Sequence, residues 1–565
     1  MVGKVSLIWS NEYPSKADVR IAALWKKVVP FGNEPTLGLM NLHRRNFNRA
    51  ALWLALGSWA AATGVRAAAT PHWRSNPFTL GVASGQPRPD SIVLWTRLAP
   101  DADAGLGTGL DFGADNSNDS DAGYPVRYEV FSDAAMRQPV CQGEVMAWPS
   151  RAFSIHVTVQ GLQAGRDYWY RFQSGDATSR VGRTRTAPAP DADVRRLRIA
   201  LASCQHYEQG FFAAQRDMAA TELDFVLFVG DYIYEGTSPA YTVRQHGVPA
   251  PHTLQQYRAR HALYKRDVDL QASHAAHPWI VTLDDHEVVN DYADDRDPAY
   301  TDPARFLQRR AAAYRAYFEH MPMAIGPQGP AMRIHDRFSW GRLADLWTLD
   351  TRQHRSHHAC PDPMHDNGRA VTNCAELSDP SRTMLGAEQE RWLATGLTDK
   401  SPARWKLVGQ TTQMSATGLD TPEGRSNWTD GWAGYPLARQ RLLQGMADAG
   451  VQNAVVLGGD VHRHVAADLR VRPNDATSPV IASEFVGGSV TSRGAGQAAM
   501  ARMQRDNPDV KHARGDERGW ALLDISRTAL HCEMRTTAHP VAKDAVFTRQ
   551  AGFTVEAGRA GVQAG

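Results

Sequence analysis

Long apolar runs are missing from this 565-residue chain, and cysteine is scarce, with five in total. Downstream of residue 69, no stretch approaches the roughly 18 consecutive apolar residues of a membrane-spanning helix, so we expect no transmembrane segment in the mature chain. A block of lysine and arginine is missing there too, which argues against a nucleic-acid-binding patch or an anionic-membrane surface. A substrate must therefore be recognised locally, in a site.

Positive charge is concentrated near the N-terminus. Residues 1–69 hold nine Lys/Arg and three Asp/Glu, so the formal charge of +2 becomes −4 for the remainder. A twin arginine, Arg44 and Arg45, precedes a short apolar stretch and an A-x-A end, the pattern of a Tat export signal cleaved after Ala69. Met40 would start such a signal in the usual way, and a buried N-terminal helix is the alternative. We expect the Tat translocase as partner and a periplasmic or extracellular destination.

The five cysteines have different predicted roles in an oxidising compartment. Cys360 and Cys374 flank a short loop rich in Pro, Asp, His and Asn, and we predict a disulfide between them. Cys204 ends a short apolar run, so we assign its thiol to a metal ion, with an inert buried thiol as the alternative. Cys141 and Cys532 lie in strand-like segments and are predicted to belong to the core.

The mature chain divides into two regions of different pattern. Residues 76–190 carry short β-rich runs separated by Gly, Pro and Asp clusters, which predict a small β-sandwich domain. After a linker at 187–196, strand-like and helix-like segments alternate through 191–540, as in an α/β catalytic domain. Its last part, 519–537, predicts a hairpin. Residues 541–565 are predicted to form a C-terminal tail.

Chemically reactive side chains follow the short apolar runs of the second region. Runs of this length, separated by helix-sized segments, predict buried strands of a mostly parallel sheet, in which ligands bind beyond the carboxyl ends. Thiol, phenol, carboxylate and imidazole groups then meet at one place, a combination typical of a metal site. The residues concerned are Cys204, Asp231, Tyr234, Asp284, Asp285, His286, Glu287, Asp350, Asp460 and His462.

The donor types predict two unlike metal ions. Soft, phenolate and imidazole donors suit iron or zinc, whereas an oxygen-rich shell suits calcium, magnesium or manganese. Two cations about 3.5–4 Å apart can bind a hydroxide between them and support an in-line displacement at phosphorus. His286 can then protonate the leaving oxygen or hold a phosphoryl oxygen. The predicted ligands are Cys204, Asp231, Tyr234 and His462 for the first ion, and Asp231, Asp285 and Asp460 for the second, with Asn290 either near that ion or capping a turn.

Five motifs follow one another along the chain. They are S-C-Q (203–205), G-D-Y-I-Y-E-G (230–236), D-D-H-E-V (284–288), D-T-R-Q-x-R (350–355) and G-D-V-H (459–462). Each motif alone is a weak or moderate signal, but their order and their placement at strand ends form a strong one. Together they resemble the PhoD-like alkaline phosphatase/phosphodiesterase family, within the purple-acid-phosphatase-like metallophosphoesterases.

The resemblance implies an α/β fold, with a metallophosphoesterase-type β-sandwich flanked by helices and preceded by a small fibronectin- or immunoglobulin-like sandwich. It implies ferric iron on the first ligand set and calcium beside it. It also places Asp350 and Arg352 in the pocket, where the guanidinium would bind phosphoryl oxygens. Arg355 is a weaker candidate, because an Arg after a strand is more often in a surface ion pair.

We therefore predict a secreted, metal-dependent phosphohydrolase that acts on small phosphate esters, both monoesters and diesters, through a metal-bridging hydroxide. Its predicted catalytic residues are His286, Asp350 and Arg352. One alternative is a phospholipase-D-like phosphodiesterase of phospholipids or teichoic acids, with apolar contact from the Trp-rich residues 415–435, although these aromatic side chains could instead pack at the rim. A non-catalytic binder of cell-wall polymers is the alternative of another class. The sequence predicts neither the natural substrate nor the oligomeric state.

Overall fold

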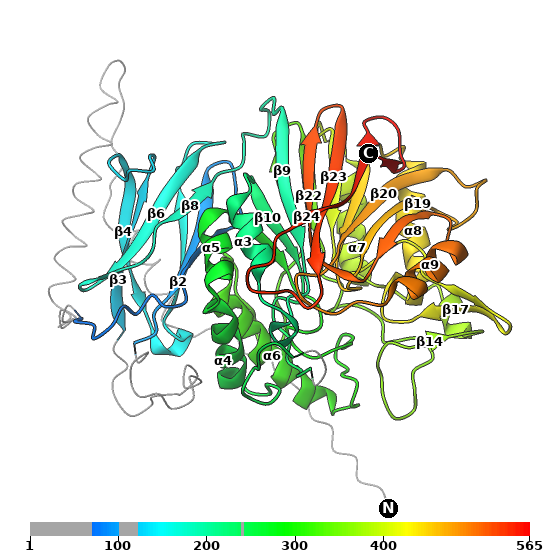
Figure 1. Cartoon of the computed structure of the whole chain (residues 1–565), viewed down its shortest axis with the longest axis horizontal. Helices are drawn as coiled ribbons and strands as arrows, with labels where there is room; N and C mark the ends of the chain where they lie inside the picture. The colour runs from blue at the N-terminus through cyan, green and yellow to red at the C-terminus, as the bar shows by residue number, and fades with distance from the viewer. Residues whose placement is uncertain (1–70, 101–122, 239–241, 400) are drawn as a thin grey trace, which may run out of the picture. The chain divides into compact units, whose positions relative to one another are not determined.

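The computed structural model describes residues 71–100, 123–238, 242–399 and 401–565. The Tat signal predicted within residues 1–69 lies outside these ranges and stays a prediction. In the described part of the chain, a ten-stranded and a seven-stranded sheet pack face to face (Figure 1). Within the same ranges, no helix combines the length and the apolar character needed to cross a membrane.

The ten-stranded sheet has a parallel centre with antiparallel strands on both sides. The predicted hairpin is confirmed as its strands β22 and β23. The predicted tail at 541–565 is wrong, since this segment adds the last two strands of the sheet. In spatial order the described strands are β25 (Gln563–Ala564), β24 (Thr548–Glu556), β23 (Ala529–Ala538), β22 (Glu517–Ser526), β9 (Arg196–Ala202), β10 (Phe225–Val229), β11 (Pro278–Thr282), β1 (Val82–Gly85), β2 (Ser91–Arg97) and β5 (Ser154–Gln160).

The seven-stranded sheet has four adjacent parallel strands, β13, β15, β18 and β20. The reactive residues predicted for one sheet therefore follow strands of two sheets, β9 to β11 in one and β13 and β18 in the other. The prediction of a single sheet is wrong because apolar runs identify buried strands without identifying their neighbours. In spatial order the described strands are β12 (Asp336–Trp340), β13 (Ala344–Thr348), β15 (Trp405–Gly409), β18 (Ala454–Gly458), β20 (Val480–Gly487), β19 (His464–Arg470) and β21 (Val510–Arg514).

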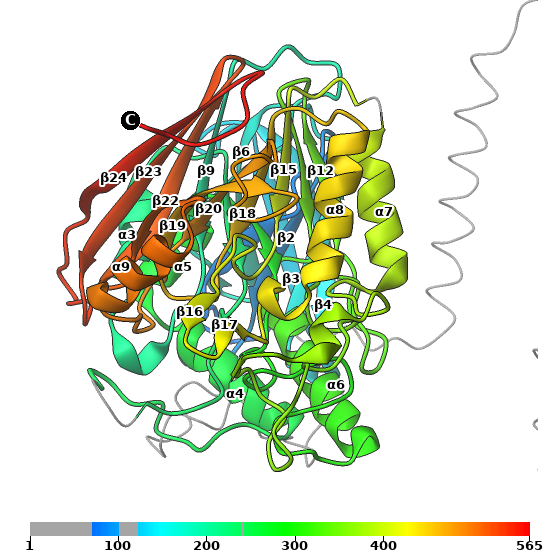
Figure 2. The same ribbon diagram turned by 90° about the vertical axis from the view of Figure 1, so that its right-hand side faces the viewer.

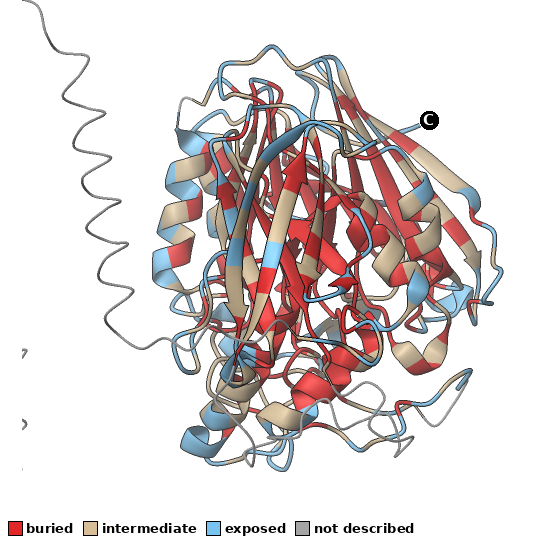
Figure 3. Cartoon of the chain, turned by 90° about the vertical axis from the view of Figure 1, so that its left-hand side faces the viewer, coloured by how far each residue is buried: buried red, intermediate tan, exposed pale blue. Residues whose placement is uncertain are grey.

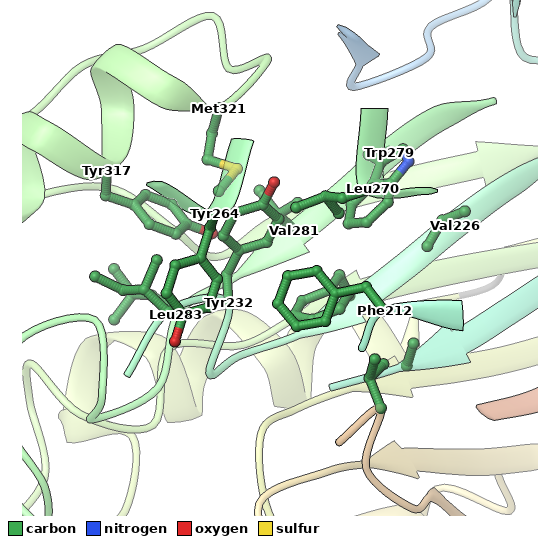
Figure 4. Packing of buried hydrophobic residues seen from close by; sticks show 14 of the residues in the cluster. Phe212, Val226, Tyr232, Tyr264, Leu270, Trp279, Val281, Leu283, Tyr317 and Met321 are labelled. Carbon is green, nitrogen blue, oxygen red and sulfur yellow. The ribbon is translucent and has the colours of Figure 1, made fainter. Parts of the chain in front are cut away.

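Alternate residues of the central strands enter two different cores, as the two-residue period of a strand requires. In β10, Leu227 packs between the sheets, whereas Val226 and Phe228 pack against helices on the other face. Figure 4 shows this helix-side core, where the rings of Phe212 and Tyr264 pack with centroids 5.7 Å apart. Full burial of each such side chain contributes about 1.5–3 kcal/mol, and Figure 3 shows that buried residues dominate the central strands.

Helices cover the outer faces of both sheets. Four helices pack on the ten-stranded sheet: α3 (Ala213–Ala220), α4 (Leu254–Lys265), α5 (Val268–Ala276) and α6 (Pro303–His320). Figure 2 shows two more beside the seven-stranded sheet, α7 (Gly386–Thr398) and α8 (Pro436–Asp448), with α9 (Gln497–Asp506) near β19. The predicted helix-flanked sandwich is therefore present in the described residues.

The N-terminal β-rich region forms a second sandwich that shares strands with the large sheet. Leu94, Val157 and Tyr170 meet in its core, between β2 and β5 on one side and a five-stranded sheet on the other. β1 pairs in parallel with β11, so the two sandwiches are joined through continuous hydrogen bonding. The five strands are β3 (Tyr124–Phe131), β4 (Pro139–Ala147), β6 (Asp167–Ser174), β7 (Ala177–Thr178) and β8 (Gly182–Arg185). A small fourth sheet of the described residues contains β14 (Ala370–Val371), β16 (Leu419–Thr421) and β17 (Gly424–Trp428).

Candidate metal centre

Several predicted ligands lie in left-handed backbone immediately beyond a strand. L-residues adopt this conformation rarely, at a cost of about 1 kcal/mol or more each, and it clusters at functional sites. Gly230 turns the chain before Asp231 at a φ of 97°, and a Cβ atom there would lie 2.6 Å from the Cβ of Asp284. These turns carry the side chains off the strand ends into one space. The φ values are 58° at Cys204, 57° at Asp231, 61° at Asp460 and 51° at His462.

The four ligands predicted for the first ion converge. Ligand atoms of Cys204, Asp231 and His462 all lie within 4.8 Å of one another. The Tyr234 Oη lies 2.9 Å from the Asp231 Oδ2 and 2.9 Å from the His462 Nε2. The His462 Nδ1 lies 2.9 Å from the Arg493 carbonyl oxygen, so an N–H there donates to the carbonyl and leaves the Nε2 lone pair facing the cluster.

The electrostatics of this cluster favour a bound cation. Burial, and then the charge of Asp231, raise the pKa of the Cys204 thiol and of the Tyr234 phenol well above their usual values. Burial likewise raises the pKa of Asp231 and lowers the pKa of His462 to about 3. The Asp231 Oδ1 is buried without a hydrogen-bond partner in the described chain. Thiolate, phenolate, carboxylate and neutral imidazole fit a metal of the iron or zinc type, which would stabilise their deprotonated forms.

An oxygen-rich set of ligand atoms adjoins this cluster. Asp231 lies within 4.8 Å of both Asp285 and His286, and Asp285 forms a further group of the same size with Asp291 and Asp430. Asp291 and Asp430 were not predicted from the sequence, because Asp291 lies in an irregular loop and Asp430 follows β17, a short and mostly polar strand instead of an apolar run. The carboxylates of this set fit a hard cation such as calcium.

Asp460 lies at the margin of these groups. Its Oδ2 accepts a hydrogen bond of 2.6 Å from the Thr412 hydroxyl. It belongs to none of the ligand-atom groups formed by the described residues. Burial, and then the charge of nearby Asp284, raise its pKa well above the usual value. A role for Asp460 as a ligand stays a prediction.

His286 is held by a buried carboxylate. Its Nδ1 lies 2.7 Å from the Glu235 Oε2, and its ring stacks on Tyr234 with centroids 4.0 Å apart. The other Glu235 oxygen accepts the Asn290 backbone N–H at 2.9 Å, and the role of the Asn290 side chain stays a prediction. Burial lowers the pKa of His286, but Glu235 and Asp285 outweigh burial and raise it well above the usual value. Sequence analysis included Glu235 in a motif without giving it a role.

Arg352 and Asp350, both predicted to lie in the pocket, are buried. Arg352 is 1% exposed, and its guanidinium pairs with Asp284 and, at 2.8 and 3.0 Å, with both oxygens of Asp430. Asp350 accepts the backbone N–H groups of Arg352 at 2.9 Å and Gln353 at 3.0 Å. Their predicted roles in the pocket, where Arg352 would bind phosphoryl oxygens, stay predictions. Arg352 joins carboxylates and Asp350 fixes the turn that carries it.

Glu287 ties together the two loops that carry the carboxylates. It is buried, and its oxygens accept the backbone N–H groups of Tyr232 at 2.6 Å, Asp284 at 2.8 Å and Asp231 at 3.2 Å. Burial raises the pKa of Glu287 to about 7. Glu287, the last acidic residue of the D-D-H-E-V motif, therefore positions the backbone of Asp284 and of Asp231. The sequence pattern did not predict this role.

A buried arginine supports the other side of the first cluster. Arg518, on β22, donates to the Ser489 hydroxyl at 2.7 Å and to the His462 carbonyl oxygen at 3.2 Å. Its positive charge lies near the Cys204 thiol and the Tyr234 phenol, and burial lowers its own pKa to about 10. This charge favours the anionic forms of both ligands. The surrounding sequence reads as an ordinary strand and gave no sign of this role.

Loops close the rim of the centre. The predicted Cys360–Cys374 disulfide is confirmed, with the two Cα atoms 6.1 Å apart. Trp432 and Tyr435 are each 1% exposed, so the packing interpretation is correct for them. Trp428 is 51% exposed and is available for apolar contact at the rim.

Comparison with known proteins gives consistent matches. The model of the PhoD-like phosphatase family matches residues 199–534, and that of the PhoD-like phosphatase N-terminal domain matches residues 64–188. Alkaline phosphatase D of Bacillus subtilis (strain 168) is 39% identical over 526 residues, which cover 91% of this chain and 86% of that protein. A solved structure of PhoD is 38% identical, with a TM-score of 0.81 over 87% of this chain and 93% of that one.

Proposed function

This chain belongs to the PhoD-like phosphatase family and is a phosphatase, and we propose that it hydrolyses phosphate esters at two metal ions bound between the ends of its two sheets. The resemblance and the fold class predicted from the motifs are confirmed by these comparisons. One observation carries the proposal: Tyr234 lies 2.9 Å from both Asp231 and His462, beside Cys204. A shared cation would explain why a thiol, a carboxylate, a phenol and an imidazole are buried this close together, because it would stabilise their deprotonated forms.

We assign the first ion to Cys204, Asp231, Tyr234 and His462, with iron as its identity. We assign the second, with calcium as its identity, to Asp231 and Asp285 together with carboxylates that adjoin them. Metal ions bound there would lower the pKa of water and neutralise charge on phosphoryl oxygens. One loop carries Asp231 and another carries Asp285. Glu287 holds the two loops together by accepting backbone N–H groups from both.

The protein groups then act around the phosphoryl group. His286, beside Asp231 and Asp285 and held by Glu235, is placed to donate a proton to the leaving oxygen. We assign Arg352 a positioning role, because its ion pairs with Asp284 and Asp430 fix the carboxylates of the second set. Hydrogen bonds from the backbone to Asp350 keep Arg352 in place.

Metal content and the visible spectrum of the purified mature protein test the assignment of the first ion. We expect about one iron per chain and a visible absorption band from its phenolate ligand. Tyr234→Phe should lose this band, because it removes the phenolate oxygen and leaves the other three ligands. Tyr168→Phe, in the N-terminal sandwich, is the matched control and should keep it. Protein without bound metal, and without phosphatase activity after addition of iron and calcium, would sink the proposal.

We also propose that the reaction takes place outside the cytoplasm, because Arg44 and Arg45 form a Tat-type signal with the apolar stretch that follows them. Replacing both arginines with lysine should leave an uncleaved precursor in the cytoplasm. Cell fractionation with an immunoblot for the chain measures this. Equal amounts of processed protein outside the cytoplasm in both strains would contradict Tat export.

A further inference from the structure

A cavity of about 270 Å³ lies where the N-terminal strands meet the segment that precedes β12. None of the residues assigned to the metal centre lines it, so it is a separate space. Its walls combine polar groups with apolar side chains. The lining residues used below are Gln86, Arg88, Ile325, Arg333, His335 and Asp336.

Hydrogen-bond donors of this cavity are left unused. Arg333 is exposed at this cavity, and its guanidinium has no hydrogen bond or ion pair with any residue in the described ranges. The Gln86 side-chain nitrogen is likewise unpaired there, while the Gln86 Oε1 accepts the Ala324 backbone N–H at 2.8 Å. His335 makes a ring contact with Trp392, at 4.9 Å between centroids, and no hydrogen bond within the described chain. A guanidinium, an amide and an imidazole therefore remain available to a ligand.

The carboxylate in the lining is already neutralised. One oxygen of Asp336 pairs with the Arg88 guanidinium, and the other accepts the Arg337 backbone N–H at 2.7 Å. Arg88 also donates to the Arg337 carbonyl oxygen at 2.6 Å and stacks 4.3 Å from the centre of the Phe338 ring. Asp336 therefore has its charge satisfied by Arg88, and the charge of Arg333 is left without a counterion in the cavity.

We propose that this cavity is a second binding site, specific for a small oxyanion of the phosphate type. A planar guanidinium presents two parallel N–H groups that match two oxygens of a phosphate. The volume is below the about 300 Å³ at which pockets for drug-sized ligands begin, which favours inorganic phosphate or a small phosphomonoester. The exposed Ile325 side chain forms an apolar border. The proposal depends on the donors of the cavity and not on the metal centre.

Chemical modification of Arg333 in the metal-loaded protein tests the site directly. Phenylglyoxal reacts with accessible guanidinium groups, and peptide mass spectrometry gives the rate at each arginine. With inorganic phosphate at about twice its dissociation constant, the rate at Arg333 should fall about threefold, since protection follows one plus the ratio of ligand concentration to that constant. Chloride keeps the ionic strength equal in all samples.

Arg559 is the matched control, because it is exposed, lies outside the cavity and pairs with Glu556. Its modification rate should not change with phosphate. His335→Ala should weaken the protection of Arg333 by removing one donor. An Arg333 rate that phosphate leaves unchanged, or that falls in step with Arg559, would overturn the proposal. Because the readout is at Arg333 itself, this result is independent of phosphatase activity and so of the proposed function.

Discussion

Asp231→Asn is expected to lower kcat/KM by more than the roughly 100-fold upper limit that is typical for outer-shell residues of metal sites, and to lower the metal content of the purified protein. Asp231 belongs to two groups of ligand atoms, one with Cys204 and His462 and one with Asp285 and His286, and its Oδ1 is buried without a partner in the described chain. An amide keeps one neutral oxygen that can ligate a cation. Its NH₂ group has no lone pair available for a second cation, so an asparagine cannot be shared between two ions. The measurements are phosphatase kinetics and elemental analysis of the same preparations.

The fold of this variant should survive. Burial raises the pKa of Asp231 when no metal is bound, so burying this carboxyl costs folding free energy at neutral pH. A neutral side chain of the same size removes that cost. We therefore expect the metal-free variant to unfold at the same temperature as the metal-free parent, or higher. Asp524→Asn, at a half-buried ion pair with Arg196, is the matched control. Full metal content with less than about a tenfold loss of activity would show that Asp231 is not a shared ligand.

The convergence of the side chains predicted for the first ion could be anticipated from sequence, because the members at strand ends have two signals at once. Cys204 and Asp231 directly follow apolar strands, and their side chains are of types that bind metal. Parallel strands bring such ends together whatever the details of packing. The same reasoning assigned the strands to one sheet, whereas they belong to two. The side chains converge nevertheless, because β10 and β18 end on the same side of the interface.

Residues that act through tertiary contacts could not be predicted. Arg352 after a strand has the same local pattern whether it faces a substrate or a buried carboxylate, and only the position of Asp430, 78 residues later, decides. Asp430 lies in the bend that follows the short polar strand β17, where an aspartate usually signals a turn. Strand β24 was missed for a related reason, since its exposed, polar start hides the buried Phe553 and Val555 near its end.

His286→Asn should lower kcat by about 10²–10⁴, the usual contribution of general acid–base catalysis, without changing the metal content. The imidazole adjoins Asp231 and Asp285, the two carboxylates that we assign to the metal ions, and an asparagine cannot deliver a proton in its place. Glu235→Gln should cost less, about 10–100-fold, because Glu235 acts by holding the ring through a 2.7 Å contact with Nδ1. Steady-state kinetics and elemental analysis of both variants give these values.

The double variant separates a positioning role of Glu235 from an independent one. If Glu235 acts through His286, then Glu235→Gln adds little to the loss already caused by His286→Asn, and the two effects are strongly non-additive. If the loss of kcat in the double variant equals the product of the two single losses, Glu235 acts independently of His286. Loss of metal from His286→Asn would instead make His286 a ligand, which its proximity to Asp231 and Asp285 also permits. His531→Asn, at a solvent-exposed contact with Thr554 on the C-terminal strands, controls for the substitution itself.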